Sequence, residues 1–115
     1  MIARIAPAKL AGTVPPIASK SVAHRAVIAA ALANGTTHII CNTVCDDIEA
    51  TIGCLVALGA RFETVADGFI VHPIPKSQEH GILRALAGSV LDCRESGSTL
   101  RFMLPVACAL GADAT

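Results

Sequence analysis

The chain has 115 residues, 53% of them hydrophobic, and a formal net charge of zero. This length allows one modest domain, and the neutral charge excludes a global field that would recruit nucleic acid or an anionic membrane. The longest apolar runs are shorter than the ~18 residues of a transmembrane helix, and the first residues lack the features of a secretory signal. Five cysteines, an odd number at irregular spacing, favour a reduced, cytoplasmic protein over a disulfide-linked one.

The first part of the chain predicts an alternation of strands and helices. Residues 1–7 alternate enough for a short strand, and residues 10–18 form a Gly/Pro-containing connector. We expect a helix over residues 21–34, with Ser21 as its N-cap, because the apolar run begins there. The β-branched residues of segment 36–42 then predict a strand.

The middle of the chain predicts a helix followed by a hairpin. The helix covers residues 45–60, with Asp46 as its cap, Glu49 at the capping-box position and an apolar stripe. Residues 60–73 predict two strands joined by a turn at Asp67-Gly68.

The last part of the chain predicts one more strand and one more helix. Residues 76–88 are expected to be a loop followed by a short helix, and residues 89–94 a strand. Residues 95–112 predict a helix opened by Ser and Gly, which Pro105 should kink or delay. The order strand, helix, strand, helix, hairpin, strand, helix indicates an α/β or α+β layered domain.

Two of the predicted helix starts have the same chemistry. Residues 19–25, SKSVAHR, and 95–101, ESGSTLR, each combine small hydroxyl residues with a cation near backbone N–H groups that lack helical partners. A charge-assisted hydrogen bond is worth about 1.5–3 kcal/mol and the helix dipole about 0.3–1 kcal/mol, so the cations dominate. Each start alone also fits ordinary capping. Together they lead us to expect that Lys20, Arg25 and residues 96–98 converge on an anion with two acidic groups.

Other polar residues are weaker candidates. Cys41 and Cys45, near His38, would suggest zinc, but the spacing is not that of a zinc knuckle, so we predict reduced thiols and no metal site. We interpret the carboxylates of segment 46–49 as helix caps rather than as a catalytic pair. We interpret His24 as a surface histidine.

Three segments resemble a known family. Residues 19–37, SKSVAHRAVIAAALANGTT, residues 45–60 and residues 91–110, LDCRESGSTLRFMLPVACAL, are similar to the N-terminal part of 5-enolpyruvylshikimate-3-phosphate synthases, or 3-phosphoshikimate 1-carboxyvinyltransferases. The resemblance runs from about residue 9 to the end, with the motifs in the same order. The related UDP-N-acetylglucosamine enolpyruvyl transferases have Asn at the position of Ser21 and lack the arginine that matches Arg25.

The resemblance implies an activity. Members of the family transfer the enolpyruvyl group of phosphoenolpyruvate to the 5-hydroxyl of shikimate 3-phosphate and release phosphate, in chorismate and aromatic amino-acid biosynthesis, without a metal or organic cofactor. Lys20 is the implied catalytic residue and is expected to contact both substrates. The implied substrate-binding residues are Lys20, Ser21, Arg25, Gly97, Ser98 and Arg101. Ser21 and Arg25 are expected to hold shikimate 3-phosphate, and Gly97 to let phosphoenolpyruvate lie against the backbone.

This chain departs from the family in one motif and in length. ESGS stands where many relatives have NSGT or NAGT, so Glu95 adds a negative charge that we expect to pair with Arg94 or Arg101. The family fold is an inside-out barrel of βαβαββ units in two domains. By the resemblance, residues 1–15 belong to the second domain and residues 16–115 are part of the first.

The family's catalytic carboxylates match nothing in this chain. We therefore expect these 115 residues alone to be inactive and to pack against a second domain. A non-catalytic anion-binding module or remnant, or an enzyme like the UDP-N-acetylglucosamine transferases, stays open as an alternative.

Overall fold

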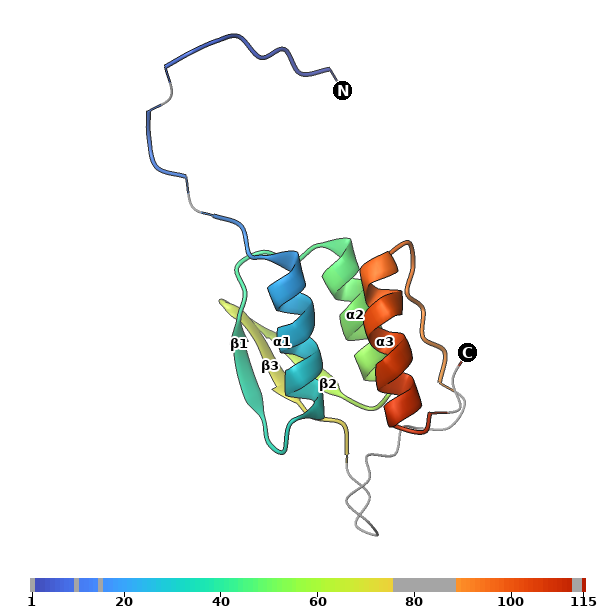
Figure 1. The fold of residues 1–115 in the computed structure, drawn as a ribbon. Helices are drawn as coiled ribbons and strands as arrows, with labels where there is room; N and C mark the ends of the chain where they lie inside the picture. Colours follow the sequence, from blue (N-terminus) through green and yellow to red (C-terminus); the bar gives the residue numbers. More distant parts are fainter. Residues whose placement is uncertain (1, 10, 15, 76–88, 113–114) are drawn as a thin grey trace.

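The computed structural model describes residues 2–9, 11–14, 16–75, 89–112 and 115. It shows a small α/β domain in which the helices α1 and α2 lie on one face of a three-stranded sheet and α3 lies beside α2 (Figure 1). In chain order the elements are α1 (Lys20–Leu32), β1 (Thr37–Ile40), α2 (Asp46–Ala57), β2 (Arg61–Val65), β3 (Gly68–His72) and α3 (Gly97–Ala109). The layered α/β class expected from the sequence is therefore correct.

The sheet is antiparallel, with β3 between β1 and β2. Val65 pairs with Gly68, so the hairpin turn lies at residues 66 and 67, one position earlier than predicted. A Cβ atom on Gly68 would lie 1.9 Å from the carbonyl oxygen of Ile39 in the neighbouring strand β1. Only glycine allows this close approach of the two strands.

The core lies between the sheet and the helices α1 and α2, and α3 packs against α2. The predicted stripe of α2 is correct, since Ile48 and Leu55 are buried and Ile52 packs against the core. The buried cluster consists of Val27, Ala30, Ala31, Cys54, Leu55, Leu58, Ala60, Phe69, Val71, Ile74, Met103 and Leu110.

The helix starts differ from the predictions in their caps. The N-cap of α1 is Ser19 rather than Ser21, because Ser19 is still extended and its carbonyl accepts the bond from Ala23 N–H at 2.9 Å. The N-cap of α2 is Cys45 rather than Asp46, and no side chain caps it. The predicted capping box is therefore wrong, although the carboxylates of the first turn still favour the helix dipole.

The start of α3 follows its prediction more closely. Ser96 is the N-cap, and its Oγ accepts a hydrogen bond from the N–H of Thr99 at 3.2 Å. Pro105 lies inside the helix.

The two outer strand predictions are wrong. Residues 2–9 form no strand and are exposed, extending away from the domain (Figure 1). A strand needs a hydrogen-bonding neighbour, and no strand in the described ranges lies beside this segment.

Residues 89–94 form only an isolated bridge. Leu91 N–H donates to the carbonyl of Thr115 at 2.8 Å, and the N–H of Thr115 donates to Ser89 at 3.2 Å. The positive φ of 48° at Arg94 then turns the chain towards α3. The loop and short helix predicted for residues 76–88 lie outside the described residues. In the described ranges, no helix combines the length and the apolarity that crossing a bilayer requires.

Candidate anion-binding site

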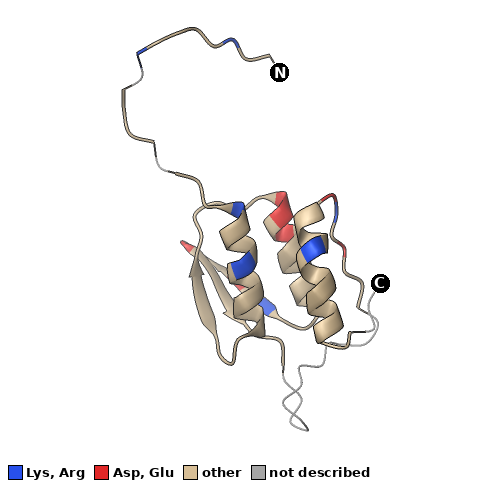
Figure 2. Ribbon diagram, viewed as in Figure 1, with Lys and Arg blue, Asp and Glu red and all other residues tan. Residues whose placement is uncertain are grey.

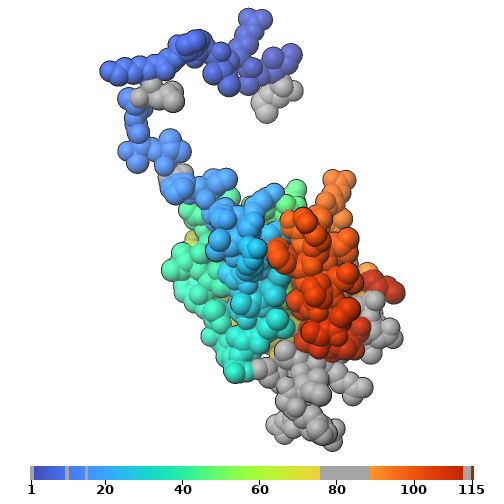
Figure 3. All heavy atoms as spheres, in the orientation of Figure 1, coloured from blue at the N-terminus to red at the C-terminus, as the bar shows by residue number. Residues whose placement is uncertain are grey.

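The helices α1 and α3 begin at the same end of the molecule and lie next to each other on its surface (Figures 1 and 3). A cavity of about 360 Å³, called here the interhelix pocket, opens between them. Its lining residues are Ser21 and Arg25 from α1 and Ser98, Arg101 and Phe102 from α3. The structure thus brings four of the sequence-predicted residues around one cavity.

The charge of the interhelix pocket is positive. Its lining includes two arginines and no carboxylate. Basic residues lie on α1 and α3, and acidic residues lie at the start of α2 (Figure 2). Two guanidinium groups and two hydroxyl groups are suitable partners for a phosphate or a carboxylate.

Arg25 is held in position by contacts with both helices. Its Nη1 donates to the carbonyl of Ser21 at 2.9 Å, one turn earlier in α1. Its guanidinium also lies over the ring of Phe102 in α3, 5.4 Å from the centroid. Such a cation–π contact is worth about 0.5–1 kcal/mol at an exposed site. Phe102 is not among the site residues expected from the sequence, although its position four residues after Ser98 places both on one helix face.

Lys20 lies outside the lining of the interhelix pocket. Its Nζ donates to Oδ2 of Asp47 at 2.6 Å. This hydrogen bond raises the pKa of Lys20 above its ordinary value and lowers the pKa of Asp47. Lys20 therefore stays a cation with a counter-ion, and the expected convergence of Lys20 with Arg25 does not occur in this arrangement.

The start of α3 faces two different cavities. Ser98 lines the interhelix pocket, whereas Ser96 lines a separate cavity of about 270 Å³ together with Asp46, Asp47, Arg94 and Glu95. Because three carboxylates outnumber one guanidinium there, this second cavity disfavours an anion.

Residues 96–98 thus do not form a single anion-binding site. Gly97 lines neither cavity, and a Cβ built on it would meet open space. The predicted pairing of Glu95 also differs from the structure, because Arg94 binds Glu49 at 3.3 Å instead. In the described part of the chain Arg101 likewise forms no ion pair with Glu95.

His24 is buried, which contradicts its interpretation as a surface residue. It is 1% exposed, and its Nδ1 lies 2.8 Å from Oγ1 of Thr51 in α2. Burial lowers the pKa of His24 below its ordinary value. The sequence does contain a sign that His24 is buried. It lies three residues before Val27, a core residue, and therefore on the same face of the helix.

The zinc candidates are dispersed. His38 binds Asp67 at 3.0 Å, and the thiol of Cys41 donates to the carbonyl of Thr43 at 3.2 Å. All five cysteines are free, and burial raises the pKa of Cys54 to about 12. In the described ranges no group of three or more His, Cys, Asp or Glu side chains could hold a metal ion.

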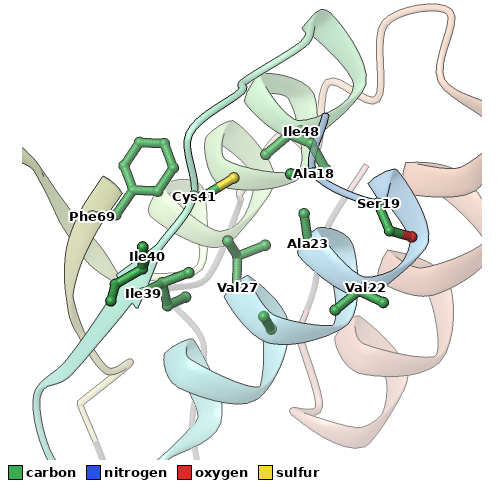
Figure 4. A pocket seen from close by; sticks show the side chains of 11 residues that line it. Ala18, Ser19, Val22, Ala23, Val27, Ile39, Ile40, Cys41, Ile48 and Phe69 are labelled. Carbon is green, nitrogen blue, oxygen red and sulfur yellow. The ribbon is translucent and has the colours of Figure 1, made fainter. Parts of the chain in front are cut away.

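A third cavity, of about 170 Å³, lies between α1 and β1 (Figure 4). No charged side chain lines it, so it offers no partner for an acidic ligand. Its lining consists of Ala18, Ser19, Val22, Ala23, Ala26, Val27, Ile39, Ile40, Cys41, Ile48 and Phe69. The interhelix pocket is therefore the candidate anion-binding site.

Comparisons with known proteins identify relatives that match most of this chain. The 3-phosphoshikimate 1-carboxyvinyltransferase of Clostridium beijerinckii is 41% identical over 90% of this chain and 24% of the relative. That of Clostridium botulinum strain Eklund 17B is 43% identical over 91% of this chain and 24% of the relative. The solved structure of EPSP synthase from Acinetobacter baumannii matches with a TM-score of 0.60 and 26% identity, over 80% of this chain and 20% of that one.

The chain thus spans about a quarter of the length of the curated relatives that it matches. The family model for EPSP synthase (3-phosphoshikimate 1-carboxyvinyltransferase) matches residues 5–114. Because this match covers nearly every residue, the chain belongs to the EPSP synthase family.

Proposed function

We propose that this chain forms part of an enzyme that transfers the enolpyruvyl group of phosphoenolpyruvate to the 5-hydroxyl of shikimate 3-phosphate, with release of phosphate. The observation that carries the proposal is the interhelix pocket, in which Arg25 and Arg101 from two family motifs face one cavity. Family membership supplies the reaction. Both substrates carry a phosphate and a carboxylate, so they need several cations at one place.

The pocket residues divide between the substrates. Ser21 and Arg25 bind shikimate 3-phosphate, and Ser98 and Arg101 contribute a hydroxyl and a positive charge from the facing helix. The backbone at Gly97 is open to solvent, which leaves room for phosphoenolpyruvate to approach.

Lys20 contributes positive charge to the reaction. The 5-hydroxyl loses its proton as its oxygen bonds to C2 of phosphoenolpyruvate, and C3 gains a proton. The C2–O bond to phosphate then breaks and C3 loses a proton, which restores the double bond and releases phosphate. Negative charge grows on the departing phosphate and is stabilised by nearby cations. Because the pKa of Lys20 is raised, it acts as a cation rather than as a base. Its pair with Asp47 is exposed to solvent, with the lysine side chain 59% exposed, so a substrate anion can compete for the ammonium.

The proposal includes the architecture of the longer protein. The elements α1, β1, α2, β2 and β3 form most of one βαβαββ unit of the first domain, residues 16–115, and residues 1–15 belong to the second. Two features support packing against more protein. Leu100 and Leu104 of α3 are 55% and 62% exposed, and residues 2–9 extend away from the domain.

Binding by this chain alone is expected to be weak. Three charge-assisted contacts supply roughly 5–9 kcal/mol, whereas association costs roughly 4–15 kcal/mol. We therefore expect shikimate 3-phosphate at millimolar concentration to shift the NMR amide signals of residues 20–25 and 98–102. Arg25→Ala should abolish these shifts. The matched control is Arg61→Ala, which removes an exposed arginine paired with Glu63 on β2 and should leave them unchanged.

Three further ligands separate the proposal from its alternatives. Shikimate, which lacks the phosphate, should produce no shift. Equal affinity for inorganic phosphate and shikimate 3-phosphate would instead indicate a non-catalytic anion-binding module, and preference for UDP-N-acetylglucosamine would indicate the related transferase. The 115 residues should show no turnover of the two substrates, and phosphate release by the purified chain would contradict the proposed need for a second domain.

A further inference from the structure

A buried polar cluster joins all three helices and contacts one lining residue of the interhelix pocket, Phe102. We call it the buried network; it consists of His24 from α1, Thr51 from α2, and Ser96 and Thr99 at the start of α3. Nδ1 of His24 lies 2.8 Å from Oγ1 of Thr51, which lies 2.9 Å from Oγ1 of Thr99. The Thr99 hydroxyl donates to Oγ of Ser96 at 2.8 Å. None of the four residues is more than 6% exposed.

The other ring nitrogen of His24 determines its tautomer. Nε2 is buried and has no hydrogen-bond partner in the described structure. A hydrogen on Nε2 would be an orphaned buried donor, which is rarer and costlier than an unpaired acceptor. The proton of the neutral ring therefore belongs on Nδ1, from which it is donated to Thr51.

With Nδ1 as the donor, Thr51 is the acceptor of the first hydrogen bond in the network. The Thr51 hydroxyl itself donates a hydrogen bond either to Oγ1 of Thr99 or to the carbonyl of Asp47, 3.2 Å away. The Thr99 hydroxyl has two acceptors within reach: Oγ of Ser96, the N-cap of α3, at 2.8 Å, and the carbonyl of Asp47 at 3.1 Å. The hydrogen bonds between His24 and Thr51 and between Thr51 and Thr99 thus join α1, α2 and α3.

His24 also contacts the wall of the interhelix pocket. Its ring centroid is 5.7 Å from that of Phe102, the ring over which the guanidinium of Arg25 lies. The charged groups that act on His24 are Lys20 and Arg25 from α1 and Asp47 from α2, while α3 presents the Phe102 ring. Displacing the imidazole would remove the support of Phe102 and, through it, of Arg25.

We propose that His24 is a positioning residue for the interhelix pocket: neutral and protonated on Nδ1, it anchors the buried network and fixes Phe102 and Arg25 in their ligand-binding positions. Its role in catalysis rests on the function proposed above. The positions of the ring, of Phe102 and of Arg25 can be measured without any ligand.

The first experiment measures the tautomer in the intact 115-residue chain. The ¹⁵N chemical shifts of the two ring nitrogens distinguish an Nδ1–H imidazole from an Nε2–H one and from imidazolium. We expect the Nδ1–H form of His24 at pH 7. An Nε2–H ring, or an imidazolium at that pH, would overturn the proposal, and this result requires no variant to fold.

The second experiment compares two substitutions. His24→Asn can keep a donor near the position of Nδ1, whereas His24→Leu keeps apolar bulk and removes the donor. The ligand-free signals of the Phe102 ring and the Arg25 side chain should shift in His24→Leu and stay close to wild type in His24→Asn. Unchanged signals in a folded His24→Leu chain would refute the positioning role.

The third measurement connects the network to binding. Affinity for shikimate 3-phosphate should fall roughly tenfold in His24→Leu and stay within about twofold of wild type in His24→Asn, as expected when one charge-assisted hydrogen bond is weakened. Equal affinities in both variants would overturn the proposal. If the wild-type chain binds no shikimate 3-phosphate, the proposed function fails, and the tautomer and the ligand-free signals still decide the role of His24.

Discussion

Replacing Thr51 by valine tests the buried network most directly. Thr51→Val exchanges a hydroxyl for a methyl of nearly the same shape at a position that is 0% exposed. The hydroxyl oxygen lies 2.8 Å from His24 Nδ1 and 2.9 Å from Thr99 Oγ1. The substitution therefore removes hydrogen bonds without opening a cavity.

The expected change in the free energy of unfolding follows from the groups that lose their hydrogen-bond partners. A buried donor left without an acceptor costs about 1–3 kcal/mol, and His24 Nδ1–H becomes such a donor. Loss of the bond between Thr51 and Thr99 adds about 0.5–1.5 kcal/mol. We expect Thr51→Val to lower the free energy of unfolding by about 2–4 kcal/mol, which is large for an isosteric change.

Urea unfolding followed by far-ultraviolet circular dichroism measures this difference, since the chain contains no Trp or Tyr for fluorescence. Thr64→Val, the same exchange at an exposed position in strand β2, is the matched control and should change the free energy by less than about 0.5 kcal/mol. Equal effects of the two substitutions would show that the network contributes nothing to stability.

Three further results are expected. Burial lowers the pKa of His24 below 6.5 in the folded chain, so the unfolded chain binds more protons near that pH. The free energy of unfolding should therefore fall as the pH drops from about 7 through 6.5 towards the lowered pKa. His24→Asn should flatten this pH dependence, and an identical slope in the variant would contradict the pKa shift. Gly68→Ala should destabilise the fold by about 3 kcal/mol or more, as measured by urea unfolding, because its Cβ would collide with the carbonyl of Ile39; a loss below about 1 kcal/mol would refute this close approach. Asp47→Asn should lower the pKa of Lys20 in an NMR titration of its side chain, and an unchanged pKa would show that the ion pair does not form in solution.

Local sequence patterns determined most of the secondary structure and the family. The apolar stripe of α2, the β2–β3 hairpin and the N-cap Ser96 all depend on residues within a few positions of one another. Such signals act through backbone periodicity and capping, so they are readable without a fold. Such patterns give a wrong prediction where an element needs a neighbour elsewhere in the chain. Residues 2–9 alternate like a strand, but no strand of the described sheet lies beside them to form hydrogen bonds.

Only the tertiary structure decided which side chains at the helix starts lie around the same cavity. Ser96 and Ser98 are two positions apart, yet packing turns them to different cavities. Lys20 binds Asp47, which is 27 residues away in the chain, and His24 is buried against Thr51 at the same separation. The sequence alone identified the cations at the two helix starts. Which of them share a cavity depends on how the helices pack, because burial and counter-ions are properties of side chains that meet across helices rather than along one.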